Sequence, residues 1–246
     1  MSTELSERFL NAFCRLEDEL RKVTGYGSHE SFSLMLDHAS RFHSGFSHYR
    51  DDLREYAELR NAIVHKRIGD APIAEPHPEI VERIESAADI LTQTPRLSDH
   101  FRKHVEVCSP QDSIKQVLVK MLKGHFNQIP VYNGKRIAGL LTSDAIAFWL
   151  AESLQSDFVD GNTKIRDLIG HSTSAENFAV LSGECSIFDA IDVFEKAHKR
   201  GKHLQAIIVT ENGDSDQRPI GIITTLEVPS LITLVNPEPP VPVRRH

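Results

Sequence analysis

The sequence has few of the features that mark membrane or secreted proteins. No apolar run reaches the roughly 18 residues that a membrane-spanning helix needs, and the first ten residues lack the basic-then-apolar layout of a secretory signal. The three cysteines, Cys14, Cys108 and Cys185, are far apart and give neither a zinc-binding spacing nor a disulfide framework. We therefore expect a cytoplasmic protein with no membrane contact and no metal site.

An excess of positive charge is also lacking. The 246 residues include 28 Lys and Arg against 35 Asp and Glu, which gives a formal net charge of −7. This balance argues against broad, nonspecific binding to nucleic-acid backbones, so DNA is not an expected partner. Hydrophobic residues make up 40% and charged residues 26%, values that are ordinary for a globular protein. The length allows one or two domains.

Residues 1–97 have the apolar spacing of amphipathic helices, with hydrophobic side chains three and four residues apart. Glycine and proline residues separate the periodic stretches and should end the helices. Four amphipathic helices with short links predict a four-helix-type bundle. The expected helices cover residues 5–23, 32–42, 49–66 and 78–91.

The second half contains an internal repeat. Residues 128–142 have the pattern of a strand, a turn at Asn133-Gly134 and a second strand, and residues 205–224 repeat it with a longer turn. Gly139 and Gly221 are 82 positions apart, and so are Thr142 and Thr224. Two copies of one supersecondary unit are therefore expected. Helices are expected over about 113–123 and 186–199 before the hairpins, and from about Ser143 and Thr225 after them.

This repeat resembles tandem CBS domains, a pair called a Bateman module. The resemblance covers residues 98–235, with one unit over about 98–160 and the other over about 161–235, followed by a Pro-rich tail, 236–246. The expected fold class is α+β, with the helical bundle followed by two β-α-β-β-α units packed as a pair. In that family such pairs often bind adenosyl ligands and often dimerise. The resemblance implies a homodimer regulated by AMP, ADP, ATP or another adenosyl compound, with no cofactor required.

The same resemblance points to particular ligand-binding residues. Nucleotide binders of this family usually carry an Asp three residues after the Thr, where it accepts hydrogen bonds from the ribose. Ala145 takes that place after Thr142, whereas Glu227 takes it after Thr224. The resemblance therefore favours a site at Thr224 and Glu227 over one at Thr142. A threonine hydroxyl at a helix start also suits a phosphate. The alternative is that both threonines only cap helices.

A second resemblance rests on Arg60-x4-His65, within the stretch LRNAIVHKR. It resembles the signature of HEPN domains, small helical bundles of which many are metal-independent ribonucleases. As often in that family, a polar residue, here Asn61, follows the Arg. The resemblance covers residues 1–97. Two further Arg–His pairs with comparable gaps lie beside or across a glycine and lack this helical context: Arg41/His48 and Arg166/His171.

Arg60, Asn61 and His65 suit metal-free RNA cleavage. Histidine transfers protons near neutral pH, and arginine binds phosphate oxygens through two N–H groups. On a helix, Arg60 lies about 140° around the axis from His65, so only its long side chain reaches across. The resemblance places such a site at a dimer cleft and makes RNA a partner. The alternative is that Arg60 and His65 pair with acidic side chains or backbone carbonyls and only hold the dimer.

The charge of the helical half weakens the RNA interpretation. Residues 1–97 have 12 Lys and Arg against 17 Asp and Glu, so an RNA-binding surface must be local. No Walker-type or Gly-x-Gly-x-x-Gly loop and no nucleophile elbow is present in the sequence, so a nucleotide would be sensed and not hydrolysed. A non-enzymatic sensor or adaptor remains the main alternative to a ligand-controlled ribonuclease, and a purely structural dimer is a third. The basic residues available for RNA are Arg50, Arg54, Arg60, Lys66 and Arg67.

Overall fold

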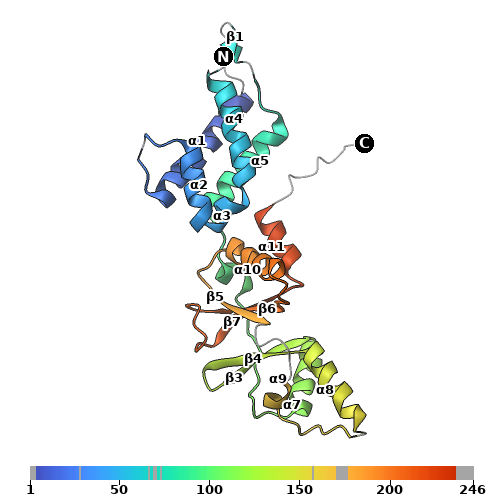
Figure 1. Ribbon diagram of the computed structural model, residues 1–246. Helices are drawn as coiled ribbons and strands as arrows, with labels where there is room; N and C mark the ends of the chain where they lie inside the picture. Colours follow the sequence, from blue (N-terminus) through green and yellow to red (C-terminus); the bar gives the residue numbers. More distant parts are fainter. Residues whose placement is uncertain are drawn as a thin grey trace, which may run out of the picture. The chain divides into compact units, whose positions relative to one another are not determined.

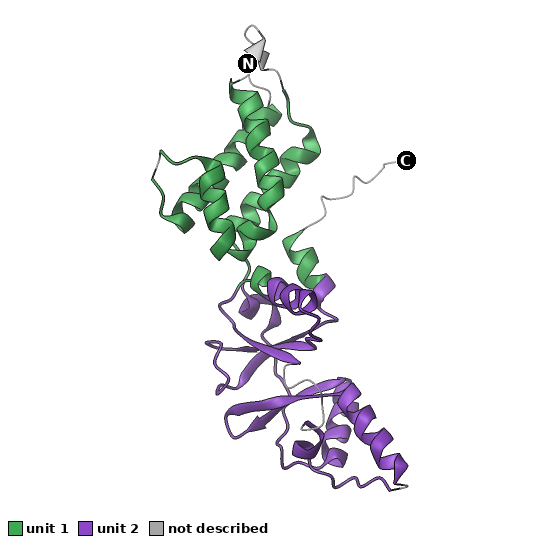
Figure 2. Ribbon diagram, in the orientation of Figure 1, with its two compact units in different colours: residues 1–95, 186–189, 230–246 green, residues 96–185, 190–229 purple. Residues whose placement is uncertain are grey.

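The chain forms two compact units, which Figure 2 distinguishes by colour. One comprises residues 1–95, 186–189 and 230–246, and the other residues 96–185 and 190–229. The expected helix end at Lys66, His171 and nearly all of the Pro-rich tail fall outside the described residues. The computed structural model describes residues 4–27, 29–65, 67–68, 71–72, 74–156, 158–169 and 177–236, with backbone alone at 67–68 and 71–72.

All four helices expected in the first half are present (Figure 1). The structure adds a short helix, α3, directly before the third of them, and a pair of two-residue antiparallel strands after it. The elements are α1 (Glu4–Thr24), α2 (Phe32–Phe42), α3 (Ser44–His48), α4 (Arg50–His65), β1 (Arg67–Ile68), β2 (Ala71–Pro72) and α5 (Pro78–Thr92).

The apolar stripe of α1 is buried, with Phe9, Leu16 and Leu20 fully covered. Hydrophobic burial holds these helices together, because the exposed ion pair between Arg8 on α1 and Glu85 on α5 contributes only about 0–1 kcal/mol. Two hydrophobic residues expected on the apolar stripes, Val23 and Phe42, are exposed instead. Val23 is 39% exposed. Phe42 is 78% exposed, since it is the last residue of α2 and the backbone of the next residue is extended.

The second half begins with α6 (Leu97–Phe101) and contains both copies of the repeat. Helices and a mixed sheet in one chain confirm the α+β class. Two helices of the second copy, α10 and α11, begin in one compact unit and end in the other. The further elements are α7 (Ile114–Gly124), β3 (Gln128–Asn133), β4 (Arg136–Thr142), α8 (Ser143–Gln155), α9 (Ile165–Ile169), β5 (Phe178–Ser182), α10 (Ile187–Lys199), β6 (Ala206–Thr210), β7 (Pro219–Thr224) and α11 (Val228–Val235).

The two copies share their strand register. Val131 faces Gly139 in the first hairpin, and Val209 faces Gly221 in the second; a register shift follows directly after each valine. The sheets differ in size, because β5 runs parallel to β6 in the second copy, whereas in the described part of the first copy the corresponding contact is an isolated parallel bridge between Cys108 and Val131. The expected β-α-β-β-α order includes a strand before the first helix of each unit. In the second copy β5 is that strand, although sequence analysis did not place it at particular residues.

Two expected boundaries are wrong. The first hairpin pairs Asn133 with Arg136, so Gly134 and Lys135 form its two-residue turn, not Asn133-Gly134. The glycine supplies the positive φ of 64° that such a turn requires. In the second copy, the last helix begins at Val228, not near Thr225, because the residues between form a turn closed by Glu227.

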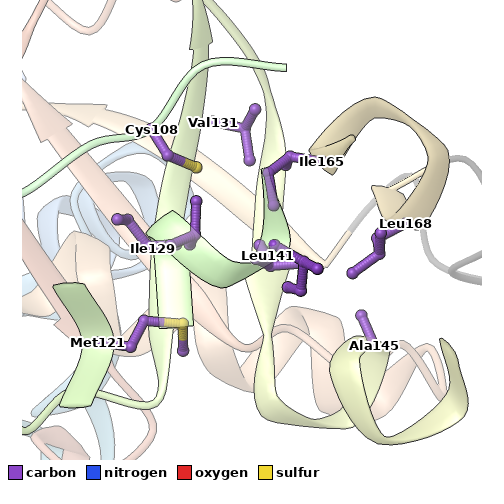
Figure 3. Close-up of a cluster of buried hydrophobic side chains, with 10 residues drawn as sticks. Cys108, Met121, Ile129, Val131, Leu141, Ala145, Ile165 and Leu168 are labelled. Carbon is purple, nitrogen blue, oxygen red and sulfur yellow. The ribbon is translucent and has the colours of Figure 1, made fainter. Parts of the chain in front are cut away.

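Each copy has its own apolar contacts, and the two hairpins also pack together. The first core contains ten buried side chains (Figure 3). One is Cys108, and the other nine come from α7, β3, β4, α8 and α9. Tyr132 and Ile137 of the first copy cluster with Ile208 of the second. The Tyr132 hydroxyl donates to the Gln217 carbonyl at 3.0 Å. The two hairpins therefore lie against each other within one compact unit.

The expected boundaries of the two units, 98–160 and 161–235, do not match their contacts. Each copy packs against a segment that these boundaries place in the other. Leu97 and Ser98 donate backbone hydrogen bonds to the carbonyls of Cys185 and Gly183, and Lys103 donates to that of Ile220. Residues 97–103 thus run along the second copy. Conversely, Ile165 and Leu168 of α9, which come after about 160, are buried in the first core.

Candidate functional site

Arg60, Asn61 and His65 lie together at the end of α4. The Arg60 Nη1 atom lies 3.0 Å from His65 Nε2 and 3.3 Å from Asn61 Oδ1. Asn61 and His65 are exposed, and Arg60 is partly exposed. The guanidinium therefore spans the angular gap between positions 60 and 65, and all three side chains can meet a molecule from solvent.

The contact between Arg60 and His65 determines which nitrogen of the imidazole accepts a hydrogen bond. A guanidinium can only donate hydrogen bonds, so Nε2 of His65 must accept, and the proton of the neutral ring then lies on Nδ1. Among the described residues, the hydrogen-bond partners of Arg60 are Asn61 and His65. The alternative interpretation required acidic partners, for which Glu55 and Glu58 of the same helix were the candidates; neither is among the partners of Arg60.

The other basic side chains expected near an RNA are already paired. Arg50 and Arg54 both donate to Oδ1 of Asp37, at 2.9 and 2.7 Å. These two guanidinium groups hold the pKa of the Asp37 carboxyl below its ordinary value. The side chains of Lys66 and Arg67 fall outside the described residues. Of the five expected cations, Arg60 is thus the one seen at an exposed site without an acidic partner.

Thr224 and Glu227 contact each other at the turn before α11. The Thr224 backbone N–H donates to Glu227 Oε2 at 2.8 Å, and the Thr224 hydroxyl donates to the same oxygen. The Leu226 N–H donates to the Thr224 hydroxyl at 3.2 Å. Oε2 of Glu227 is therefore occupied, while Oε1 faces the Lys103 ammonium at 3.9 Å. The arrangement places a hydroxyl, a carboxylate and an ammonium within one small region.

Lys103 was missed by sequence reasoning. It comes from the segment after α6, far upstream of the second hairpin, and is held there by its backbone hydrogen bond to Ile220. The Lys103 side chain is about half exposed, so its ammonium can reach a ligand as well as Glu227. No local pattern around position 103 points to Thr224, because their proximity depends on how the segment runs along β7.

Thr142 acts as a helix cap. Its hydroxyl accepts a hydrogen bond from the Ala145 N–H at 3.3 Å, and its residue is 7% exposed. The neighbouring Asp144 accepts from the Gln205 side chain at 3.4 Å. Because this hydroxyl is both buried and engaged, the capping interpretation describes what Thr142 does in the structure.

Among the described residues, no group of three or more His, Cys, Asp or Glu side chains is placed to hold a metal ion. Within the same part of the chain, every helix is too short or too polar to cross a membrane.

Comparison with known proteins identifies part of the repeat. Residues 97–152 match the CBS domain family. The chain is also 27% identical over 128 residues to the uncharacterized protein MJ1225 of Methanocaldococcus jannaschii. That alignment covers 46% of each protein, so the chain spans less than half of this relative.

Several solved structures resemble the chain at low identity. The CBS domain pair of protein MJ0100, in complex with 5′-methylthioadenosine and S-adenosyl-L-methionine, is 18% identical, covers 56% of this chain and 96% of its own, and has a TM-score of 0.41. CBSX2 in complex with AMP is 16% identical, with 57% and 98% covered and a TM-score of 0.41. The CBS-domain protein ATU1752 of Agrobacterium tumefaciens is 15% identical, with 55% and 90% covered and a TM-score of 0.41. The expectation of a CBS unit is thus confirmed by the family match at residues 97–152.

Proposed function

We propose that the chain is a regulatory protein whose two repeat units form a CBS pair that senses an adenine nucleotide or another adenosyl compound. The observation that carries this proposal is the family match at residues 97–152 together with the register shared by the two hairpins. Two equivalent units packed against each other are what a tandem module requires. Residues 98–235 then form the sensor, and residues 1–97 form the part that it controls.

The ligand binds beside Thr224 and Glu227. Oε2 of Glu227 already accepts two hydrogen bonds from Thr224. Oε1 therefore accepts the hydrogen bond that a ribose hydroxyl donates. The Lys103 ammonium, on the same side of the carboxylate, supplies a positive charge for a phosphate. Thr142 makes no comparable site, since its hydroxyl is buried in a helix cap.

Calorimetric titration with AMP, ADP, ATP and S-adenosyl-L-methionine tests this site. A hydrogen bond to a charged group contributes about 1.5–3 kcal/mol, so Glu227→Ala should weaken binding roughly tenfold or more. Asp144→Ala is the matched control, because it removes an acidic residue beside the corresponding threonine of the first copy. Wild-type protein that binds none of the four compounds, or equal affinity in Glu227→Ala, would contradict the proposal.

The helical half provides the output, for which we propose a metal-independent endoribonuclease site made by Arg60, Asn61 and His65. The 3.0 Å contact between Arg60 and an accepting His65 nitrogen supports this. When a phosphate draws the guanidinium away, Nε2 takes the proton of the RNA 2′-hydroxyl. The O2′–P bond then forms and the P–O5′ bond breaks, with water protonating the leaving oxygen, while Arg60 stabilises the phosphorane charge.

RNA cleavage in excess EDTA tests the output site. The expected product ends in a 2′,3′-cyclic phosphate, and His65→Ala should abolish its formation. His77→Ala is the control, since His77 is an exposed histidine of the same helical half. Cleavage that persists in His65→Ala would remove this histidine from the mechanism.

A homodimer is also expected in sedimentation experiments, because the resembled family forms its site between two copies. The exposed Phe148 and Leu154 of α8 supply apolar surface for this dimer.

The alternative is a non-enzymatic sensor or adaptor whose helical half only dimerises or docks a protein. The pairing of Arg50 and Arg54 with Asp37 favours it, because it leaves little free positive charge for RNA. This alternative predicts nucleotide binding that Glu227→Ala weakens, and no RNA cleavage by wild-type protein.

A further inference from the structure

The start of α10 is built differently from its counterpart in the first copy. Both helices begin with a reciprocal cap made by a serine and the residue three positions later: Ser113 with Gln116 in α7, and Ser186 with Asp189 in α10. A glutamine side chain has one acceptor oxygen, whereas an aspartate has two. In α10, Oδ2 of Asp189 completes the cap, which leaves Oδ1 available for another donor.

That second oxygen binds α3. The Ser44 hydroxyl donates to Asp189 Oδ1 at 2.6 Å and also lies 3.5 Å from the Ser186 hydroxyl. Ser44 is the first residue of α3, in the helical half. Asp189 of the second copy stands where the first copy has Gln116. Its additional oxygen makes the hydrogen bond with Ser44, for which the cap of α7 has no second acceptor oxygen.

The other end of α3 contacts α11. The hydroxyl of Tyr49, which directly follows α3, donates to the Val235 carbonyl. Val235 is the last residue of α11, where helix carbonyls have no partner within the helix. Tyr49 therefore caps α11 from outside. Burial raises the pKa of Tyr49 to about 12, so the donating hydroxyl keeps its proton at ordinary pH.

Close packing joins these two polar contacts. Gly45 of α3 is buried so tightly that an added Cβ would lie 2.9 Å from the Leu91 side chain and 3.2 Å from the Phe188 ring. Phe188 is 2% exposed, and its ring centroid lies 6.1 Å from that of Tyr49. Residues of α10 and α11 thus contact the first two residues of α3 and the residue that directly follows it.

We propose that α3 is a coupling element that transmits changes in α10 and α11 to α4. The helix α11 begins one residue after Glu227, and α4 begins one residue after Tyr49. A change that moves the first turn of α11 therefore shifts the Val235 carbonyl at the other end of that helix. This displaces Tyr49, which donates to the carbonyl, and Tyr49 in turn displaces α4, which carries Arg60, Asn61 and His65. The inference rests on the proposed function only in taking ligand binding beside Glu227 as the event that moves α11. Such coupling requires that the two arrangements differ in free energy through these contacts.

Amide hydrogen exchange in the full chain, without ligand, tests the coupling through a double-mutant cycle. Glu227→Ala loosens the turn before α11, and it should speed exchange at least threefold in peptides covering 50–65. The double variant Ser44→Ala/Tyr49→Phe removes both hydroxyl donors and keeps the packing. In this background, Glu227→Ala should leave exchange in 50–65 unchanged.

The matched control is Ser47→Ala/Tyr56→Phe, the same two chemical changes on α3 and α4, at an exposed serine and at a tyrosine whose ring packs against Phe9 of α1. With this control, the response of 50–65 to Glu227→Ala should persist. An absent response in otherwise wild-type protein, or one that survives Ser44→Ala/Tyr49→Phe, overturns the proposal. Because no ligand is added, these results are independent of the titrations that test nucleotide binding.

Discussion

Gly139 and Gly221 offer a sharp test of how the repeat is built. They occupy equivalent places in the two hairpins, each opposite a valine, and neither has a positive φ. Their surroundings differ. A Cβ on Gly139 would meet its nearest atom, Ile169 Cδ1, at an ordinary 3.6 Å, whereas a Cβ on Gly221 would lie 2.3 Å from the Phe101 carbonyl oxygen. The neighbour at 221 is backbone, which cannot rotate away.

The expected stabilities follow from these distances. In Gly221→Ala the segment around Phe101 must shift, and overpacking of this severity costs about 3 kcal/mol, the upper end of the usual range. For a chain of this size that lowers the melting temperature by about 6–12 °C. Gly139→Ala meets no clash and restricts the unfolded chain, so it should change stability by at most about 1 kcal/mol, in the stabilising direction.

Thermal unfolding of the two variants, followed by circular dichroism, measures the difference. Since Lys103 lies two residues after Phe101, Gly221→Ala should also weaken nucleotide binding in the calorimetric titration, whereas Gly139→Ala should not. If Gly221→Ala melted at the wild-type temperature, or if Gly139→Ala were the more damaging change, the placement of residues 97–103 along the second copy would be refuted.

Three further outcomes are expected. Ser113→Ala removes the cap of α7 and should cost about 1 kcal/mol in urea unfolding; an unchanged midpoint would contradict the capping assignment. Burial raises the pKa of Cys108 to about 12, so iodoacetamide at pH 8 should modify the exposed Cys14 and spare Cys108, and equal rates by mass spectrometry would refute this. The pKa of Tyr49 is about 12 in the folded chain, above its ordinary value of 10.0, so its stabilising effect is complete below about pH 10 and lost as the pH rises through 12. Tyr49→Phe should flatten that part of the alkaline unfolding curve, and an unaltered curve would contradict the raised pKa.

The helices of the first half were predictable because their signal is local. Apolar residues on one face, with Pro78 at the start of α5 and glycines between helices, locate each element within a few residues. The failure is α3, because Gly45 was interpreted as a helix end. Gly45 is instead buried inside α3 against Leu91 and Phe188, and a sequence pattern cannot show partners that are distant along the chain.

The hairpins show a similar division between local and distant information. Short apolar runs on either side of a turn that contains glycine predicted both hairpins correctly. The turn residues were displaced by one position, because the bulge after Val131 shifts the register of the strand and moves the turn to Gly134 and Lys135. A bulge has no reliable sequence signal, so turn composition alone does not determine which two residues close a hairpin.

The two candidate sites differ in the same way. Arg60 and His65 belong to one helix, so the helix geometry alone limits how far apart their side chains can lie, and their contact is accessible from sequence. Glu227 was related to Thr224 by its place in the pattern of the resembled family, whereas its ion pair with Lys103 depends on a different segment of the chain. The link through Ser44 and Asp189 is more distant still, at 145 positions apart. Candidate site residues can thus be found from local patterns, whereas contacts between distant segments, such as that of Ser44 with Asp189, are created only by the folded chain.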